Sequence, residues 1–151
     1  MEVVVGNATE YTSTFEALKN IDIAYYFLHS INSSTKFDEI EREMAKTFGK
    51  AAADAKVRQI IYLGGIANDV KKSRHLQSRA DTGIELAKFG VPVLELRAGI
   101  IIGSGSASFE MLRHLTHRLP IMTTPKWVKN RTQPIAIRDV LYYLTKTAEL
   151  P

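Results

Sequence analysis

The sequence contains no cysteine and no long hydrophobic run. Without cysteine, the chain has no disulfide, no thiolate metal ligand and no thiol nucleophile. No stretch approaches the roughly 20 apolar residues of a membrane-spanning helix, and residues 1–20 lack the basic start and apolar stretch of a signal peptide. These absences exclude thiol-dependent and disulfide-stabilised classes and predict a cytoplasmic protein.

Apolar residues are nevertheless plentiful. Of the 151 residues, 45% are hydrophobic and 24% are charged, which is the balance of a soluble globular protein. Wholesale disorder is excluded, because this much apolar surface can be buried in a core. The length corresponds to one domain of ordinary size.

Basic residues outnumber acidic ones by 20 to 16, which gives a net charge of +4. They include two clusters, Lys71, Lys72, Arg74, His75 and Arg79 in the first and Lys126, Lys129 and Arg131 in the second. Neither cluster carries the ladder of aromatic side chains on which single-stranded nucleic acids stack. An anionic small molecule is therefore favoured over a nucleic acid. His114 and His117 lack a third ligand at metal-site spacing, so no metal site is predicted.

Apolar runs typical of strands alternate with segments that have helical periodicity. We expect strands at residues 2–6, 21–29, 57–63 and 91–102, and helices at residues 14–20, 37–55, 78–89, 109–119 and 139–150. Asp139 is expected to cap the last helix. The alternation predicts an α/β fold with a doubly wound, Rossmann-like parallel sheet and helices on both of its faces.

Small and polar residues follow the predicted strands. In open parallel sheets, ligands bind at the carboxyl ends of the strands. The candidate binding residues there are Asn7, Ala8, Leu28, His29, Gly64, Gly65, Ala98 and Ile101. Strand ends need turn residues in any protein, so the pattern by itself leaves a binding role and a plain turn both open.

Five segments, in this order, carry a resemblance to a known superfamily. They are residues 3–9 (VVVGNAT), 24–30 (AYYFLHS), 75–80 (HLQSRA), 97–105 (RAGIIIGSG) and 133–140 (QPIAIRDV). Together they resemble the extended and atypical short-chain dehydrogenases/reductases, in the branch of NAD(P)H-binding and nucleoside-diphosphate-sugar epimerase-like proteins.

This resemblance implies binding of NAD or NADP and an oxidoreductase or epimerase acting on a small molecule such as a nucleotide sugar. It implies that residues 1–108 are the NAD(P)-binding part and that residues 109–151 are a small substrate lobe with the closing helix. Relatives begin with a strand, a glycine-rich loop and a helix that binds the pyrophosphate. Nothing here matches that beginning, so we expect a truncated domain with impaired cofactor binding.

The catalytic pattern of the relatives is also altered. Where they carry a tyrosine, a lysine four residues later and a preceding serine, this chain has His75, Arg79 and Gly64 or Gly65. His75 is able to transfer a proton near neutral pH, and Arg79 is able to hold ribose or phosphate oxygens. Equally, both residues fit a solvated, basic start of a helix.

Three functional classes therefore stay open. The first is an NAD(P)-dependent enzyme, and the second is a non-catalytic dinucleotide sensor or regulatory module. The third is an assembly protein, possible as a homo-oligomer, that pairs through an open edge of its sheet.

Overall fold

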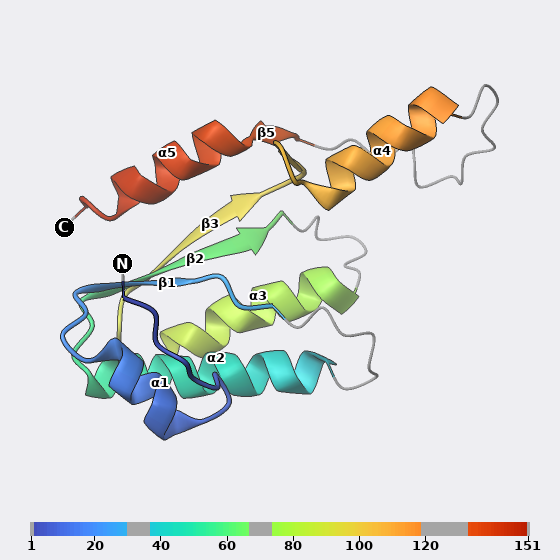
Figure 1. Ribbon diagram of the computed structural model, residues 1–151. Helices are drawn as coiled ribbons and strands as arrows, with labels where there is room; N and C mark the ends of the chain where they lie inside the picture. The colour runs from blue at the N-terminus through green and yellow to red at the C-terminus, as the bar shows by residue number, and fades with distance from the viewer. Residues whose placement is uncertain (1, 30–36, 67–73, 119–132, 151) are drawn as a thin grey trace. The chain divides into compact units, whose positions relative to one another are not determined.

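The computed structural model describes residues 2–29, 37–66, 74–118 and 133–150 (Figure 1). The chain divides into two units, Met1–Arg97 and Ala98–Pro151, and each is described by itself. The first unit holds most of the predicted strands and helices. It therefore contains most of the candidate residues.

The first unit alternates helices and strands in the order α1 (Tyr11–Leu18), β1 (Ile23–Tyr26), α2 (Phe37–Asp54), β2 (Gln59–Gly65), α3 (Arg74–Ala87) and β3 (Val93–Ala98). The strands form a sheet in the order β1-β2-β3. Strands β1 and β2 run parallel, with Ile23 opposite Gln59 and Tyr26 opposite Tyr62. This arrangement confirms the predicted α/β fold with a parallel sheet.

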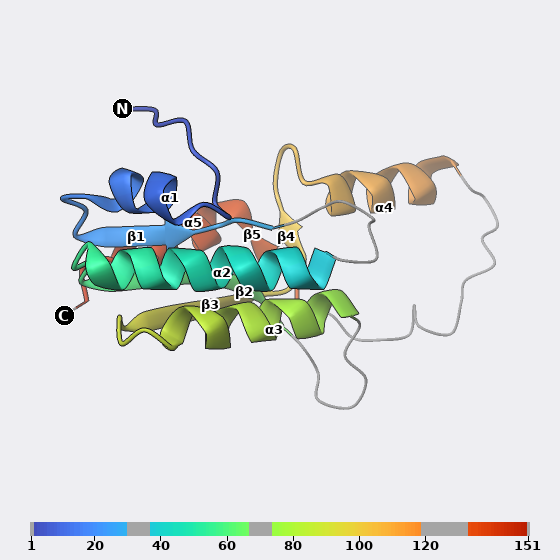
Figure 2. The same ribbon diagram turned by 90° about the horizontal axis from the view of Figure 1, so that it is seen from below.

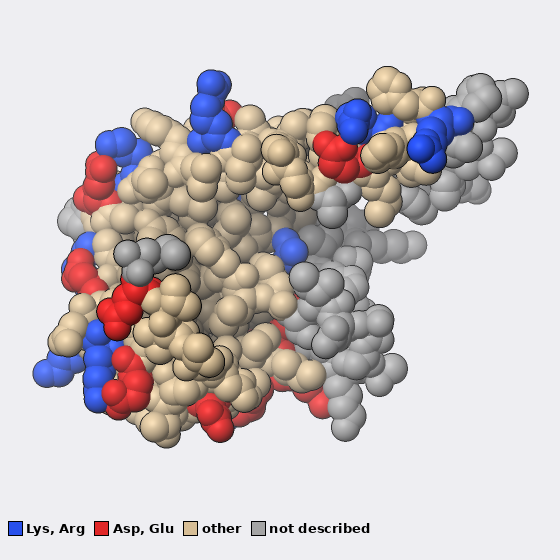
Figure 3. Space-filling view, viewed as in Figure 1, with Lys and Arg blue, Asp and Glu red and all other residues tan. Residues whose placement is uncertain are grey.

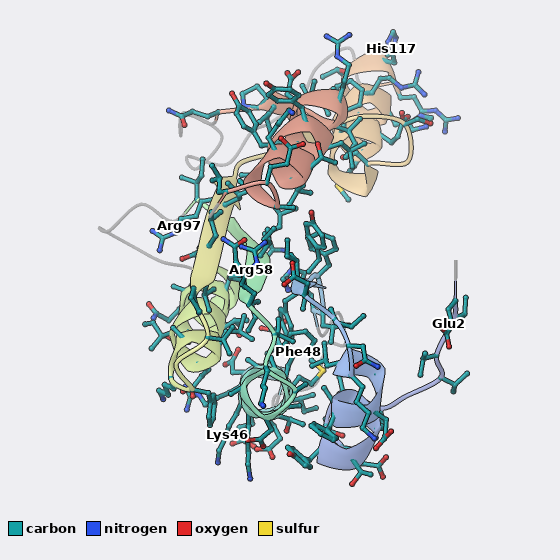
Figure 4. The ribbon with its side chains drawn as sticks, turned by 90° about the vertical axis from the view of Figure 1, so that its left-hand side faces the viewer. Glu2, Lys46, Phe48, Arg58, Arg97 and His117 are labelled. Atoms are coloured by element: carbon teal, nitrogen blue, oxygen red, sulfur yellow. The ribbon has the colours of Figure 1, made fainter. Side chains whose placement is uncertain are left out.

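Helix α2 owes its position to a buried stripe of small and aromatic residues. Ala45, Ala52 and Phe48 join the core, and in Figure 4 Phe48 points toward the sheet while Lys46 points away. The spacing of three and four residues between apolar positions in residues 37–55 predicts that Ile40 also belongs to this stripe, but Ile40 is exposed. The reason is angular: position 41, not 40, stands four residues before Ala45 on the same face.

Helix α2 ends without glycine. Lys56 adopts a left-handed conformation with φ 60°. Its N–H donates to the carbonyl oxygen of Ala53, and the N–H of Val57 donates to that of Ala52. These two bonds form a Schellman motif, which satisfies the last carbonyls of the helix and turns the chain directly into β2.

Two tyrosines stand at the centre of the core between the sheet and the helices. Tyr26 and Tyr62 are fully buried on neighbouring strands, and their ring centroids lie 6.0 Å apart. The ring of Phe48 meets Tyr26 edge-on at 5.0 Å. Helices α2 and α3 lie side by side over this face of the sheet, as Figure 2 shows. Aromatic pairs at these distances add to the stabilisation from apolar burial.

The N-terminal segment differs from its prediction. Residues 2–6 form no strand, and Val3, Val4 and Val5 are 77%, 57% and 96% exposed. A strand requires a neighbour that accepts its backbone hydrogen bonds, and none of the three described strands of this sheet pairs with these residues. Strand β1 is also shorter than predicted. The mostly apolar run at residues 21–29 predicts a strand that is covered on both faces, and this is wrong for Tyr25 and Phe27, which are exposed.

The ends of other helices and strands also differ from their predicted positions. Helix α3 begins at Arg74 instead of residue 78, and β2 continues through Gly64 and Gly65 instead of stopping before them. The run predicted as one strand at residues 91–102 is split into β3 and a separate β4 (Ile101–Ile102). The split falls at Gly99, where a Cβ atom would collide with the backbone of Gln133.

The second unit is small. In chain order it contains β4, α4 (Ala107–Arg118), β5 (Ile135–Ala136) and α5 (Ile137–Thr147). Strands β4 and β5 pair in parallel. Asp139 lies in the first turn of α5 and is not its cap, because the N-cap position is Ala136. A carboxylate there still interacts favourably with the helix dipole. Within the described ranges, no helix has the length and apolar character to cross a membrane.

The two buried tyrosines give a matched test of the core. The hydroxyl of Tyr26 has no hydrogen-bond partner among the described residues, whereas that of Tyr62 donates to the carbonyl oxygen of Arg79 at 3.0 Å. We expect Tyr62→Phe to lower the free energy of unfolding by about 1 kcal/mol and Tyr26→Phe to leave it unchanged or raise it. Urea denaturation of both variants measures this difference. Equal losses in the two variants would contradict it.

Candidate functional site

The candidate site lies at the carboxyl ends of β1 and β2. His29 follows β1, and its ring meets that of Tyr62 in β2 edge-on, with the centroids 6.4 Å apart. Arg79 of α3 adds its backbone carbonyl, which accepts the Tyr62 hydrogen bond. We call His29, Tyr62, Gly64 and Arg79 the strand-end site. The parallel pairing of β1 and β2 brings its strand residues to one edge.

His29 is half-buried, and its environment keeps it neutral. Burial lowers the pKa of His29, and the nearby charge of Arg79 lowers that pKa further. The carboxylate of Glu41 acts in the opposite direction. A neutral imidazole is able to accept a proton or a hydrogen bond, so His29 is chemically available at neutral pH.

Tyr62 has the opposite character. Burial raises the pKa of Tyr62 to about 12, with the charge of Arg79 opposing this and that of Glu95 reinforcing it. The phenol is therefore protonated at neutral pH and already donates its hydrogen bond to Arg79. Tyr62 holds the site together and does not exchange protons.

Gly64 leaves its side-chain space to Glu95. A Cβ atom at Gly64 would lie 2.7 Å from Oε1 of Glu95 and 3.3 Å from the ring of Tyr62. On the other side, a Cβ atom at Gly83 would lie 3.3 Å from Oε2 of the same carboxylate. Arg97 binds that carboxylate at 2.9 Å. The glycine at position 64 is thus explained by packing, and a serine there would require Glu95 to move.

The predicted catalytic pair lies on α3. Arg79 is half-buried, and its charge acts on His29. The backbone of His75 belongs to α3, but its side chain lies outside the described residues. The spacing of four residues puts both positions on one face of the helix. Gly65 ends β2 beside Gly64, and Leu28 is exposed next to His29.

Asn7 and Ala8 form the turn that leads into α1. The side-chain oxygen of Asn7 accepts hydrogen bonds from the N–H of Thr9 at 3.1 Å and the hydroxyl of Thr9 at 2.8 Å. Its carbonyl accepts the N–H of Glu10 at 2.9 Å. This is an Asx turn, which accounts for asparagine here without a ligand. A cofactor contact of Asn7 or Ala8 stays a prediction.

The two remaining candidates belong to the second unit. Ala98 ends β3, and Ile101 pairs with Ile135 through β4 and β5. The hydroxyl of Ser106 donates to the carbonyl of Ile101 at 2.6 Å, which closes the turn before α4. Both candidate residues are half-buried, and their role at a cofactor stays a prediction.

The structure adds two residues that the sequence reasoning missed. Glu41 of α2 and Ser78 of α3 are 6% and 5% exposed, and the hydroxyl of Ser78 donates a hydrogen bond to the carboxylate of Glu41. A signal was present: position 41 lies on the apolar stripe of α2, four residues before Ala45. An acidic residue on a core-facing stripe is rarely buried unless it is paired.

Similar folds occur among solved structures. WbmG from Bordetella bronchiseptica, in complex with NAD and UDP, matches 95% of this chain with a TM-score of 0.74 and 14% identity. The dTDP-glucose 4,6-dehydratase DesIV from Streptomyces venezuelae, with NAD bound, matches 91% with a TM-score of 0.71 and 14% identity. The triphenylmethane reductase of Citrobacter sp., complexed with NADP(H), matches 78% with a TM-score of 0.58 and 20% identity.

The chain spans about half the length of these structures or less, namely 52%, 51% and 39% of the three. No family model matches the sequence, and the comparison with curated proteins gives no match. At these identities the similarity concerns the fold. It confirms the Rossmann-like fold predicted from the sequence, the fold that these NAD- and NADP(H)-bound structures share with this chain.

Proposed function

We propose that this chain is part of an NAD(P)-dependent oxidoreductase or epimerase-like protein of the cytoplasm, with a small substrate such as a nucleotide sugar. The observation that carries this proposal is the strand-end site, where the charge of Arg79 acts on His29 beside Tyr62. This is the edge of an open parallel sheet at which ligands bind. The NAD- and NADP(H)-bound structures of similar fold support the cofactor class.

The residues present fit an anionic dinucleotide in part. Arg79 supplies a cation for ribose or phosphate oxygens, and Leu28 offers an exposed apolar side chain beside His29. Gly64 adds no free space, because the carboxylate of Glu95 occupies it. When bound, the nicotinamide supplies hydride transfer. Asn7, Ala8, Gly65, Ala98 and Ile101 stay proposed cofactor-binding residues.

We assign proton transfer to His75 and the positioning of ligand oxygens to Arg79. Residues 1–108 are proposed to bind the cofactor and residues 109–151 to cover the substrate. This chain has His75 and Arg79 where the similar superfamily carries a tyrosine and a lysine. If the chain therefore shows no turnover, the same site serves a non-catalytic dinucleotide sensor. Loss of turnover on replacing His75 in an active preparation favours the enzyme, and binding without any turnover favours the sensor.

Arg79 gives the direct test of cofactor binding. We expect NADPH to change the protein's fluorescence in a saturable way and Arg79→Ala to weaken the affinity by roughly 10- to 150-fold, since one charge-assisted contact contributes roughly 1.5–3 kcal/mol. Arg58→Ala is the matched control, because Arg58 is exposed at the opposite end of β2 and pairs with Asp22 at 3.3 Å. No saturable change up to millimolar NADPH in the wild type, or equal affinity in both variants, would contradict the proposal.

A specific observation favours a second function, which is assembly through the sheet edge. Strand β1 is an outer strand of the described sheet, and Phe27 and Leu28 just after it are exposed. In Figure 3 the charged side chains of the first unit lie mainly around its rim, and the surface over β1 and the N-terminal segment is largely uncharged. Exposed β-branched residues such as Val3–Val5 readily add to an open strand edge.

According to this second hypothesis, the chain associates with a second copy of itself through the edge of the sheet. We expect a concentration-dependent dimer in size-exclusion chromatography with light scattering, and we expect Val4→Lys to return it to a monomer. Ile84→Lys is the matched control, because Ile84 is 61% exposed but lies on α3. A monomer at every concentration, or a dimer that survives Val4→Lys, would overturn assembly through this segment.

A further inference from the structure

Glu41 stands out among the acidic residues of α2. Its neighbours Glu39 and Glu43 are exposed, whereas Glu41 is 6% exposed and faces the core. Burying a carboxylate costs free energy, and apolar residues of similar size would stabilise a core at least as well. Stability alone therefore does not explain a glutamate at this position.

A hydrogen-bond donor to Glu41 is Ser78 of α3, which directly precedes Arg79 in the chain. Ser78, 5% exposed, donates its hydroxyl to the Glu41 carboxylate. The carbonyl of Ser78 accepts the hydroxyl of Thr82 at 2.9 Å, within the same helix. The next residue along the chain is Arg79, a member of the strand-end site.

The same turn of α3 is held a second time from the sheet. The hydroxyl of Tyr62 donates to the carbonyl of Arg79 at 3.0 Å. Residues 78 and 79 are thus fixed from α2 by a carboxylate and from β2 by a phenol. Two hydrogen bonds to adjacent residues from two different elements restrict both the rotation and the sliding of the helix, and so they set the direction in which the Arg79 side chain leaves it.

Glu41 also acts by its charge. The groups that act on His29 come from three elements: Glu41 from α2, Arg79 from α3 and the ring of Tyr62 from β2. Arg79 disfavours a proton on His29 and Glu41 favours one. The charge of Glu41 therefore opposes that of Arg79 at the imidazole.

We propose that Glu41 is a positioning residue of the strand-end site, which fixes Arg79 through Ser78 and balances the charge of Arg79 beside His29. The role concerns the arrangement of the site and stands whether the ligand is NAD(P) or another anion. No direct contact between Glu41 and a ligand is part of it.

The test titrates His29 by NMR in the full chain. The chain has 4 histidines, so a His29→Gln variant identifies the His29 signal. Glu41→Gln keeps an oxygen that accepts the Ser78 hydrogen bond and removes only the charge. We expect this variant to remain folded and to titrate His29 at a lower pH than the wild type does, because a negative charge that favoured the protonated form is gone.

Glu43→Gln is the matched control, since it removes an exposed charge from the same helix. It should leave the titration of His29 unchanged. A purely structural role of Glu41 would alter the melting temperature without moving the titration. The proposal is overturned if Glu41→Gln leaves the titration of His29 in place, or if Glu43→Gln shifts it equally.

A second arm tests the link to Arg79 with NADPH as the probe. Ser78→Ala removes the tether and keeps the Glu41 charge, and we expect it to weaken NADPH binding. Combined with Arg79→Ala, it should cause no further loss, because both changes act through one side chain. Additive losses would overturn the tether. If the wild type binds no NADPH, the proposed function fails, and the titration of His29 alone then decides the role of Glu41.

Discussion

The hydroxyl of Tyr62 donates to the carbonyl oxygen of Arg79 from a ring that has no exposed surface. This one side chain joins the central strand, helix α3 and the strand-end site. Its ring also meets the rings of Tyr26 and His29, and it lies close to Gly64 and Gly83. Unlike the hydroxyl of Tyr26, that of Tyr62 has a partner among the described residues, and a donor left without one in the interior costs free energy. This hydrogen bond therefore stabilises the observed position of α3 on the sheet.

The core beneath this site is unusual in its polarity. Glu41, Ser78 and Thr82 are buried between α2 and α3, where apolar residues are the rule. Hydrogen bonds within the cluster offset part of the cost of taking these groups out of water. A polar cluster is more specific in its geometry than an apolar one, since each hydrogen bond forms only with a suitable acceptor and over a narrow range of distances and angles. That specificity suits a site that must hold an imidazole and a guanidinium in a fixed arrangement.

The edge of the sheet is the other physical feature that shapes this protein. An outer strand leaves backbone groups for a partner, and proteins usually shield such edges with charge or with a covering segment. Here the residues just after β1 are apolar and exposed, and the valines near the N-terminus are exposed as well. The chain spans 52%, 51% and 39% of the length of the three solved structures of similar fold.

Most elements of the fold were predictable from local patterns. The stripe of α2 located that helix to within a residue, because its period is set by backbone geometry that does not depend on the rest of the chain. The alternation of strands and helices likewise predicted the parallel sheet. Element ends were harder. Strand β2 runs through two glycines, and the carboxylate of Glu95 on the neighbouring strand fills the side-chain space at Gly64, a contact that the local pattern does not reveal.

The sequence by itself determined the fold class and most of the helices and strands, because periodicity is a local property. Strand-end position pointed to the candidate His29, and the resemblance to a known superfamily pointed to the candidate Arg79. Only the tertiary structure decided that Glu41 and Ser78 bond between two helices and that Tyr62 holds Arg79. It also decided that residues 2–6 form no strand. These outcomes depend on which segments meet in space. The position of Glu41 on the apolar stripe of α2 indicates burial, but it does not indicate a partner 37 positions away on another helix.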